Sequence, residues 1–186
     1  MTLNKEQTDF VNHCRHLIGQ AIVSVEYAEI IYNQDNPTPY YQTHFSNLDS
    51  VDFSIIFKTS ENNVIEIYWD GNFHQFGIGL KINKQSDFLR VQKWTVTDRE
   101  IWREIVGQNI INVDLDWETI TATDQSGKRE SFTYPQDIIL VFENKRRIFI
   151  SAAGFLHEGD EEVFGMLDNL TVTDNEELAR RTKMIP

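Results

Sequence analysis

The fold is decided by a stretch that occurs twice in the chain: residues 17–26 read LIGQAIVSVE and residues 105–114 read IVGQNIINVD. Each copy has an aliphatic pair, then Gly-Gln, a mainly apolar segment and a carboxylate. Later segments keep the same order, because residues 52–57 align with 137–142 and residues 64–68 align loosely with 146–150. We interpret this order as an internal duplication, with chance similarity among apolar strands as the alternative.

A helix is predicted immediately before each copy. Apolar residues between positions 10 and 18 recur at the spacing of one helical face, and Asn4 with Gln7 can cap the start of this helix. Gly19 and Gly107 suit the left-handed position that follows a last helical turn. The two glycines therefore end a helix and allow a strand to begin.

Alternating apolar residues and short polar turns predict that strands form most of the rest. The expected strands are residues 51–57, 65–69, 76–82, 88–94, 119–123, 130–134, 138–142, 147–152 and 170–173. Consecutive strands with short connections indicate antiparallel meanders. We therefore predict an α+β fold with a C-terminal helix, built as a single domain, 1–186, from two similar halves of about residues 1–94 and 95–186.

Composition restricts the class of protein. The chain has 186 residues and a formal net charge of −12, which disfavours nucleic-acid binding because such binding depends on cations that neutralise phosphates. Cys14 is the only cysteine, so no disulfide can form within the chain. The longest apolar run, residues 138–142, is far shorter than a membrane span, and the first residues lack the apolar segment of a signal peptide. These features predict a cytoplasmic protein that contacts neither membranes nor nucleic acids.

Motifs typical of catalysis are missing from the sequence. There is no G-x-S-x-G, H-E-x-x-H, Walker A or C-x-x-C pattern. Gly77 and Gly79 fall within a strand pattern, which indicates a bulge or space for a large side chain on a neighbouring strand. His13, Cys14 and His16 could suggest a metal or thiol site, but Cys14 lies on the apolar face of the first helix. We expect a buried thiol beside solvated histidines, with no catalytic residue and no cofactor.

A row of carboxylates is the most distinctive polar feature. Asp114, Asp116 and Glu118 alternate with apolar residues, so on a strand all three share one face. Three roles remain open: a solvated outer face, a surface that binds a partner, or a metal-dependent or small-ligand site. A second acidic segment contains Glu158, Asp160, Glu161 and Glu162 and is expected to be a solvated loop or a docking segment for a basic protein.

Three segments of the second half, residues 150–155, 168–172 and 176–181, together with the helix-Gly-Gln-strand openings, resemble a loose set of small bacterial proteins of the polymorphic-toxin immunity type. The resemblance implies a protein that binds and blocks a cognate toxin without catalysis of its own.

The sequence therefore leads to the hypothesis of a non-enzymatic protein that binds a basic protein partner through the acidic residues above. Two alternatives stay open: a metal-dependent enzyme or small-ligand binder that uses the Asp114, Asp116 and Glu118 row, and a structural module that oligomerises through an exposed strand edge. The identity of the partner and the oligomeric state are undetermined.

Overall fold

The structure is a computed structural model that describes residues 3–32, 37–73, 77–84, 86, 90–123, 126–154, 164–165 and 168–185. The helices are α1 (Lys5–Cys14), the 3-10 helix η1 (Arg15–Leu17), α2 (Glu100–Arg103) and α3 (Glu176–Arg181). The strands are β1 (Ile22–Ile30), β2 (Leu48–Val51), β3 (Phe53–Thr59), β4 (Val64–Asp70), β5 (Gly77–Ile82), β6 (Val91–Thr95), β7 (Ile110–Thr123), β8 (Arg129–Phe142), β9 (Arg147–Ser151), β10 (Ala153–Gly154), β11 (Phe164–Gly165) and β12 (Leu170–Thr173).

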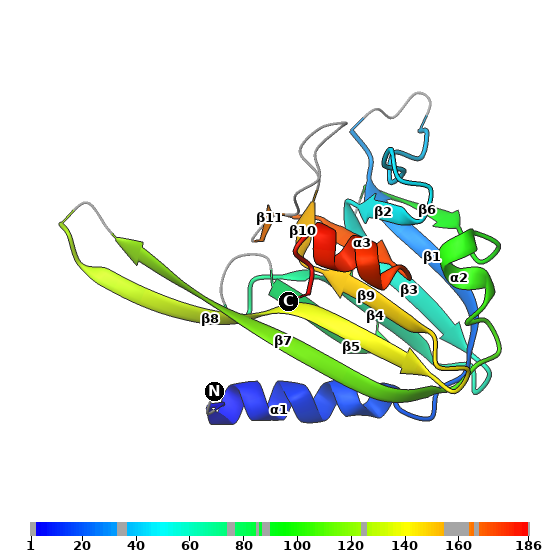
Figure 1. Cartoon of the computed structure of the whole chain (residues 1–186), viewed down its shortest axis with the longest axis horizontal. Coiled ribbons are helices and arrows are strands. Elements are labelled where there is room, and N and C mark those ends of the chain that lie inside the picture. The colour runs from blue at the N-terminus through cyan, green and yellow to red at the C-terminus, as the bar shows by residue number, and fades with distance from the viewer. Residues whose placement is uncertain are drawn as a thin grey trace.

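Two five-stranded antiparallel sheets form the body (Figure 1). The first has the order β5-β4-β3-β1-β6 and the second has the order β2-β12-β9-β8-β7. The predicted α+β class, with antiparallel meanders and helices at the start of each half and near the C-terminus, is confirmed. None of the described helices is both long enough and apolar enough to cross a membrane.

Four strands of each sheet follow one another in the same order. In the first sheet, β1, β3, β4 and β5 are neighbours in sequence order, and in the second sheet β7, β8, β9 and β12 are. The fifth strand of each sheet lies at the edge: β6 pairs with β1, whereas β2 crosses from the first half of the chain to pair with β12. The second sheet is therefore incomplete without a strand from the first half.

The twin sequence stretches meet where the two sheets join. The backbone N–H of Gly19 donates to the carbonyl of Ile110 at 2.8 Å, and the N–H of Gly107 donates to the carbonyl of Ile22 at 2.7 Å. The two bonds are equivalent to each other, because Gly107 and Ile110 lie 88 residues after Gly19 and Ile22. Both glycines have positive φ, of 89° and 80°, as expected for residues that end a helical turn.

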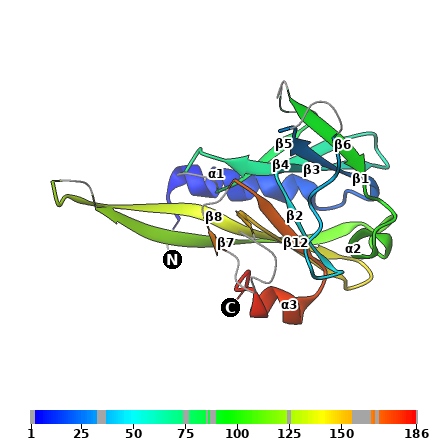
Figure 2. The same cartoon turned by 90° about the horizontal axis from the view of Figure 1, so that it is seen from above.

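The core lies between the inner faces of the two sheets. Cys14 and Leu17 from the first helical segment pack into it, together with buried aliphatic residues from both sheets. A smaller apolar cluster lies on the outer face of the second sheet, where α3 packs over Ile139 and Phe149. Seen from above, the order is first sheet, second sheet and α3 (Figure 2).

The hairpin of β7 and β8 is longer than the sequence predicts. The sequence pattern indicates one strand pair over residues 119–134 and a separate pair over residues 138–152. In the structure, β7 and β8 each run continuously for 14 residues. A register shift places Trp117 opposite Pro135 and Asp116 opposite Asp137, so Gln136 is the extra residue of a bulge that accommodates the proline. Beyond this bulge the hairpin projects well past the body (Figure 1).

Candidate functional site

The predicted carboxylate row lies on β7, the last strand of the second sheet. Asp114, Asp116 and Glu118 are all exposed, whereas the intervening Leu115 packs against the core. Asn112 Nδ2 donates to both carboxylate oxygens of Asp114, each at 2.9 Å. None of the three forms an ion pair with a described residue. The row is therefore a strip of exposed carboxylates on the outer face of the sheet, without ion pairs to the part of the chain that the structure describes.

A pocket of about 480 Å³ opens beside this row. One wall carries Asp116, Glu118 and Asp137, and the other carries Arg180 and Lys183 from the C-terminal segment. Local capping holds that segment in place. Asn175 Oδ1 accepts from the backbone N–H of Leu178 at 2.9 Å, and the hydroxyl of Thr182 donates to the carbonyl of Leu178 at 2.8 Å.

Asp137 is the buried member of this site. Its register partner on β7 is Asp116, so the two carboxylates share one face of the sheet. Asp137 is 7% exposed, and its Oδ1 has no hydrogen-bond partner among the described residues. Burial raises the pKa of Asp137 to about 8, and the charges of Asp116 and Glu118 contribute to the rise. At neutral pH the carboxyl of Asp137 is therefore mainly protonated.

Binding is the chemistry that this arrangement supports. Asp116 and Glu118 can accept hydrogen bonds from a cationic side chain, and the protonated Asp137 can donate one. Among the described residues, no group of three or more His, Cys, Asp or Glu side chains is arranged to hold a metal ion. Glu158, Asp160, Glu161 and Glu162, the other predicted site residues, lie outside the described residues.

The His13-Cys14-His16 segment has the arrangement expected from the sequence. Cys14 is 1% exposed, and burial raises the pKa of its thiol to about 12, so it is a poor nucleophile. The ring nitrogen Nε2 of His13 lies 3.3 Å from the carbonyl oxygen of Leu80, and Nδ1 of His16 lies 3.0 Å from the carbonyl oxygen of His13. One nitrogen of each imidazole ring is therefore hydrogen-bonded to a backbone carbonyl oxygen.

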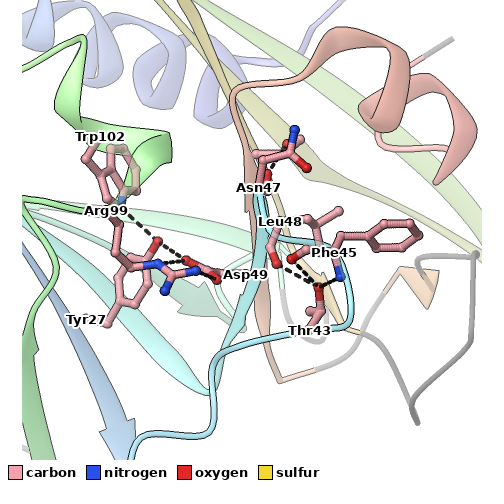
Figure 3. Close-up of polar contacts among 9 residues, drawn as sticks. Tyr27, Thr43, Phe45, Asn47, Leu48, Asp49, Arg99 and Trp102 are labelled. Carbon is pink, nitrogen blue, oxygen red and sulfur yellow. Dashed lines mark hydrogen bonds and ion pairs between the residues drawn. The ribbon is translucent and has the colours of Figure 1, made fainter.

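Asp137 and four further buried acids, Glu29, Asp49, Asp52 and Glu66, escaped the sequence analysis. Asp49 on β2 accepts two hydrogen bonds from Arg99, at 2.6 and 2.8 Å, and one from the hydroxyl of Tyr27 at 3.0 Å. The indole of Trp102 donates to that same hydroxyl at 2.8 Å (Figure 3). This network fastens the crossing strand β2 to β1 and to the start of α2.

Among the other buried acids, Glu29 and Asp52 each keep one carboxylate oxygen without a hydrogen-bond partner in the described part of the chain, whereas both oxygens of Glu66 accept hydrogen bonds from serines. The only sequence signal was an acidic residue inside or next to an apolar strand, at positions 29, 49, 52, 66 and 137. Comparison of the chain with protein-family models, curated proteins and solved structures finds no match.

Proposed function

We propose that the protein is a non-enzymatic binding protein that engages a basic surface of a protein partner through Asp114, Asp116 and Glu118. The observation that supports this proposal best is the exposed row of three carboxylates on an edge strand, without ion-pair partners among the described residues. Like charges on one face of a strand repel each other, so the row destabilises the free protein slightly. A cationic partner would relieve this repulsion.

The pocket beside the row gives this proposal a specific anchor point. A lysine or arginine of the partner that enters the pocket would meet Asp116 and Glu118, with Asp137 beneath them. The exposed acids would accelerate encounter with a basic surface, and the pocket would fix its orientation. The resemblance to immunity proteins supports a cytoplasmic role in which the partner is a toxin.

A growth-rescue assay tests this function. The C-terminal region of the adjacent reading frame would be expressed with and without the protein, and growth would be measured. We expect toxicity that co-expression of the wild type relieves. A harmless neighbour, or toxicity that the wild type leaves unrelieved, would contradict the immunity role.

The triple variant Asp114→Asn, Asp116→Asn and Glu118→Gln tests the surface. Its matched control is Asp9→Asn, Glu61→Gln and Asp98→Asn, which removes the same charge from three exposed acids elsewhere. The association rate would be measured between each variant and the toxin that the wild type neutralises in the growth assay. The β7 triple variant should associate about tenfold or more slowly than wild type at low salt, and its association rate should depend less on salt. Association rates that are equal in the two triple variants would contradict a role for the β7 row.

A further inference from the structure

A second pocket, of about 360 Å³, lies at the end of β1 and shares no residue with the β7 site. Its lining includes Glu29 from β1, Gln92 and Trp94 from β6, and Tyr32 and Tyr40 from the segments that follow β1. The volume falls within the range of small-molecule sites, which are mostly apolar with a few convergent polar groups.

Glu29 provides the charged group of this pocket. It is 1% exposed, and its register partner across the sheet is Gln92. Glu29 Oε2 accepts from the backbone N–H of Tyr40 at 3.2 Å, whereas Oε1 has no hydrogen-bond partner among the described residues. Burial raises the pKa of Glu29 to about 7, with contributions from the charges of Asp52 and Asp49. A buried carboxylate in this state is stabilised by any cation that reaches it.

The aromatic walls are held by the second buried acid. Asp52 Oδ2 accepts from the hydroxyls of Tyr32 at 2.8 Å and Tyr40 at 3.2 Å. The two rings lie 6.3 Å apart between centroids, and their side chains remain 74% and 46% exposed at the mouth. No described basic side chain forms an ion pair with Glu29 or Asp52, and Arg99 is committed to Asp49.

These features identify the class of ligand. Aromatic faces attract cations, and a buried carboxylate without a counter-ion repels anions. The apolar lining favours a stem attached to the charged group. We propose that this pocket binds an organic cation, an ammonium or guanidinium group on an apolar stem, with Glu29 as its counter-ion and Tyr32, Tyr40 and Trp94 as its walls.

The cation has two possible sources, a free amine and a side chain of a protein. Pentylamine serves as the probe for the first, and the peptides acetyl-Gly-Lys-Gly-amide and acetyl-Gly-Arg-Gly-amide serve for the second. Pentanol is the uncharged counterpart of pentylamine, and acetyl-Gly-norleucine-Gly-amide is the uncharged counterpart of the two peptides. Titrations at about pH 8, where Glu29 is mainly ionised, would be followed by the amide signals of Tyr40 and Gln92 in ¹⁵N NMR spectra.

We expect saturable shifts with Kd in the millimolar range for at least one cationic probe, and at least tenfold weaker binding of its uncharged counterpart. Response to pentylamine alone indicates a free amine, and response to a peptide indicates a protein side chain. Saturable binding of an uncharged probe as tight as that of its cation, or no saturable shift with any cation, would overturn the proposal.

Glu29→Gln is the test variant, and Glu26→Gln on the same strand is its control, because Glu26 pairs with Lys58 at 3.2 Å outside the pocket. We expect the test variant to lose at least about tenfold in affinity for the cation and the control to lose none. Tyr32→Leu, at the exposed mouth, should weaken binding severalfold with the fold intact by circular dichroism. Equal affinity of wild type and Glu29→Gln would overturn the role of Glu29.

Discussion

Asp49 and Asp137 are both buried aspartates, yet their surroundings differ. Asp49 receives two hydrogen bonds from Arg99 and one from Tyr27, so its charge is compensated although burial still raises its pKa. Asp137 has neighbouring carboxylates, its Oδ1 has no hydrogen-bond partner within the described ranges of the chain, and burial raises its pKa to about 8. Arg99 and Tyr27 therefore offset part of the cost of ionising Asp49, whereas the neighbouring carboxylates add to the cost of ionising Asp137.

Asp137→Asn should change the pH dependence of stability. Because the folded-state pKa lies above the ordinary value of 3.8, the folded state holds a proton that the unfolded chain releases. Wild-type stability therefore falls as pH rises from about 4 to about 8, and the variant lacks this loss. We expect the variant to gain ~1–3 kcal/mol relative to wild type above about pH 8, and little at about pH 4, by urea unfolding. A difference that is the same at both pH values would contradict the buried, protonated state.

Asp49→Asn should destabilise the protein strongly. It leaves the guanidinium of Arg99, whose side chain is only 23% exposed, without its counter-ion. We expect a loss of about 2–4 kcal/mol in the free energy of unfolding. Glu130→Gln is the control, because both side chains of the Lys128–Glu130 pair are more than half exposed and a change within about 0.5 kcal/mol is expected. Similar losses of unfolding free energy for both variants would show that the buried Asp49–Arg99 pair stabilises the protein no more than an exposed ion pair does.

At the scale of elements, local signals were the most predictive. The capping box of α1 is present as expected: Asn4 Oδ1 accepts from the N–H of Gln7, and Gln7 Oε1 accepts from the N–H of Asn4, both at 2.9 Å. Space for a large side chain beside the strand glycines is also confirmed, since a Cβ on Gly79 would lie 2.7 Å from Tyr68 Cζ. Both features depend on neighbours within a turn or an adjacent strand.

The hairpin arm formed by the far ends of β7 and β8 is the element whose length the sequence did not indicate. Its residues, 119–123 and 129–133, are exposed or half-buried, and hydroxyl pairs connect its strands, at 2.9 Å for Thr119–Thr133 and 3.0 Å for Thr121–Ser131. Proline is unfavourable inside a strand, and the bulge accommodates Pro135 within β8. Gln136 fixes the bulge by donating to Ser151 Oγ and to the carbonyl of Ala152.

Shortening this arm should leave the body intact. Replacement of residues 121–131 by Asn-Gly would join Ile120 to Phe132, which are already paired. We expect the unfolding free energy to change by less than about 1 kcal/mol, because the arm buries little apolar surface. Light scattering after size-exclusion chromatography gives the second readout: a mass that falls from dimer to monomer on shortening would instead support an oligomerising module. A large loss of stability without a change of mass would contradict the separation of arm and body.

At the scale of the whole molecule, the two halves of the chain depend on each other. The strand β2 belongs to the first half in sequence and to the second sheet in space, and one core lies between both sheets. The Gly19–Ile110 and Gly107–Ile22 bonds join the sheets. Each half therefore completes the other.

Cutting the chain after Thr97 tests this interdependence. Thr97 belongs with the first half, because its hydroxyl accepts from the backbone N–H of Val25 at 3.0 Å. We expect fragments 1–97 and 98–186 to be largely unfolded alone and to regain the circular dichroism and sharp NMR spectrum of the intact protein when mixed. A cooperative unfolding transition in the isolated 98–186 fragment would show that the second half is independent.

The sequence by itself determined the α+β class, the helix that opens each half and most of the strands, because helical and strand periodicities are local. It also placed Asp114, Asp116 and Glu118 on one exposed face, since alternation along a strand needs no partner. Only the tertiary structure decided that β2 crosses between sheets, that Asp137 is buried beneath the carboxylate row and that Glu29 forms the base of a second pocket. Burial and pKa depend on groups that pack from distant parts of the chain, and a linear pattern does not contain those contacts.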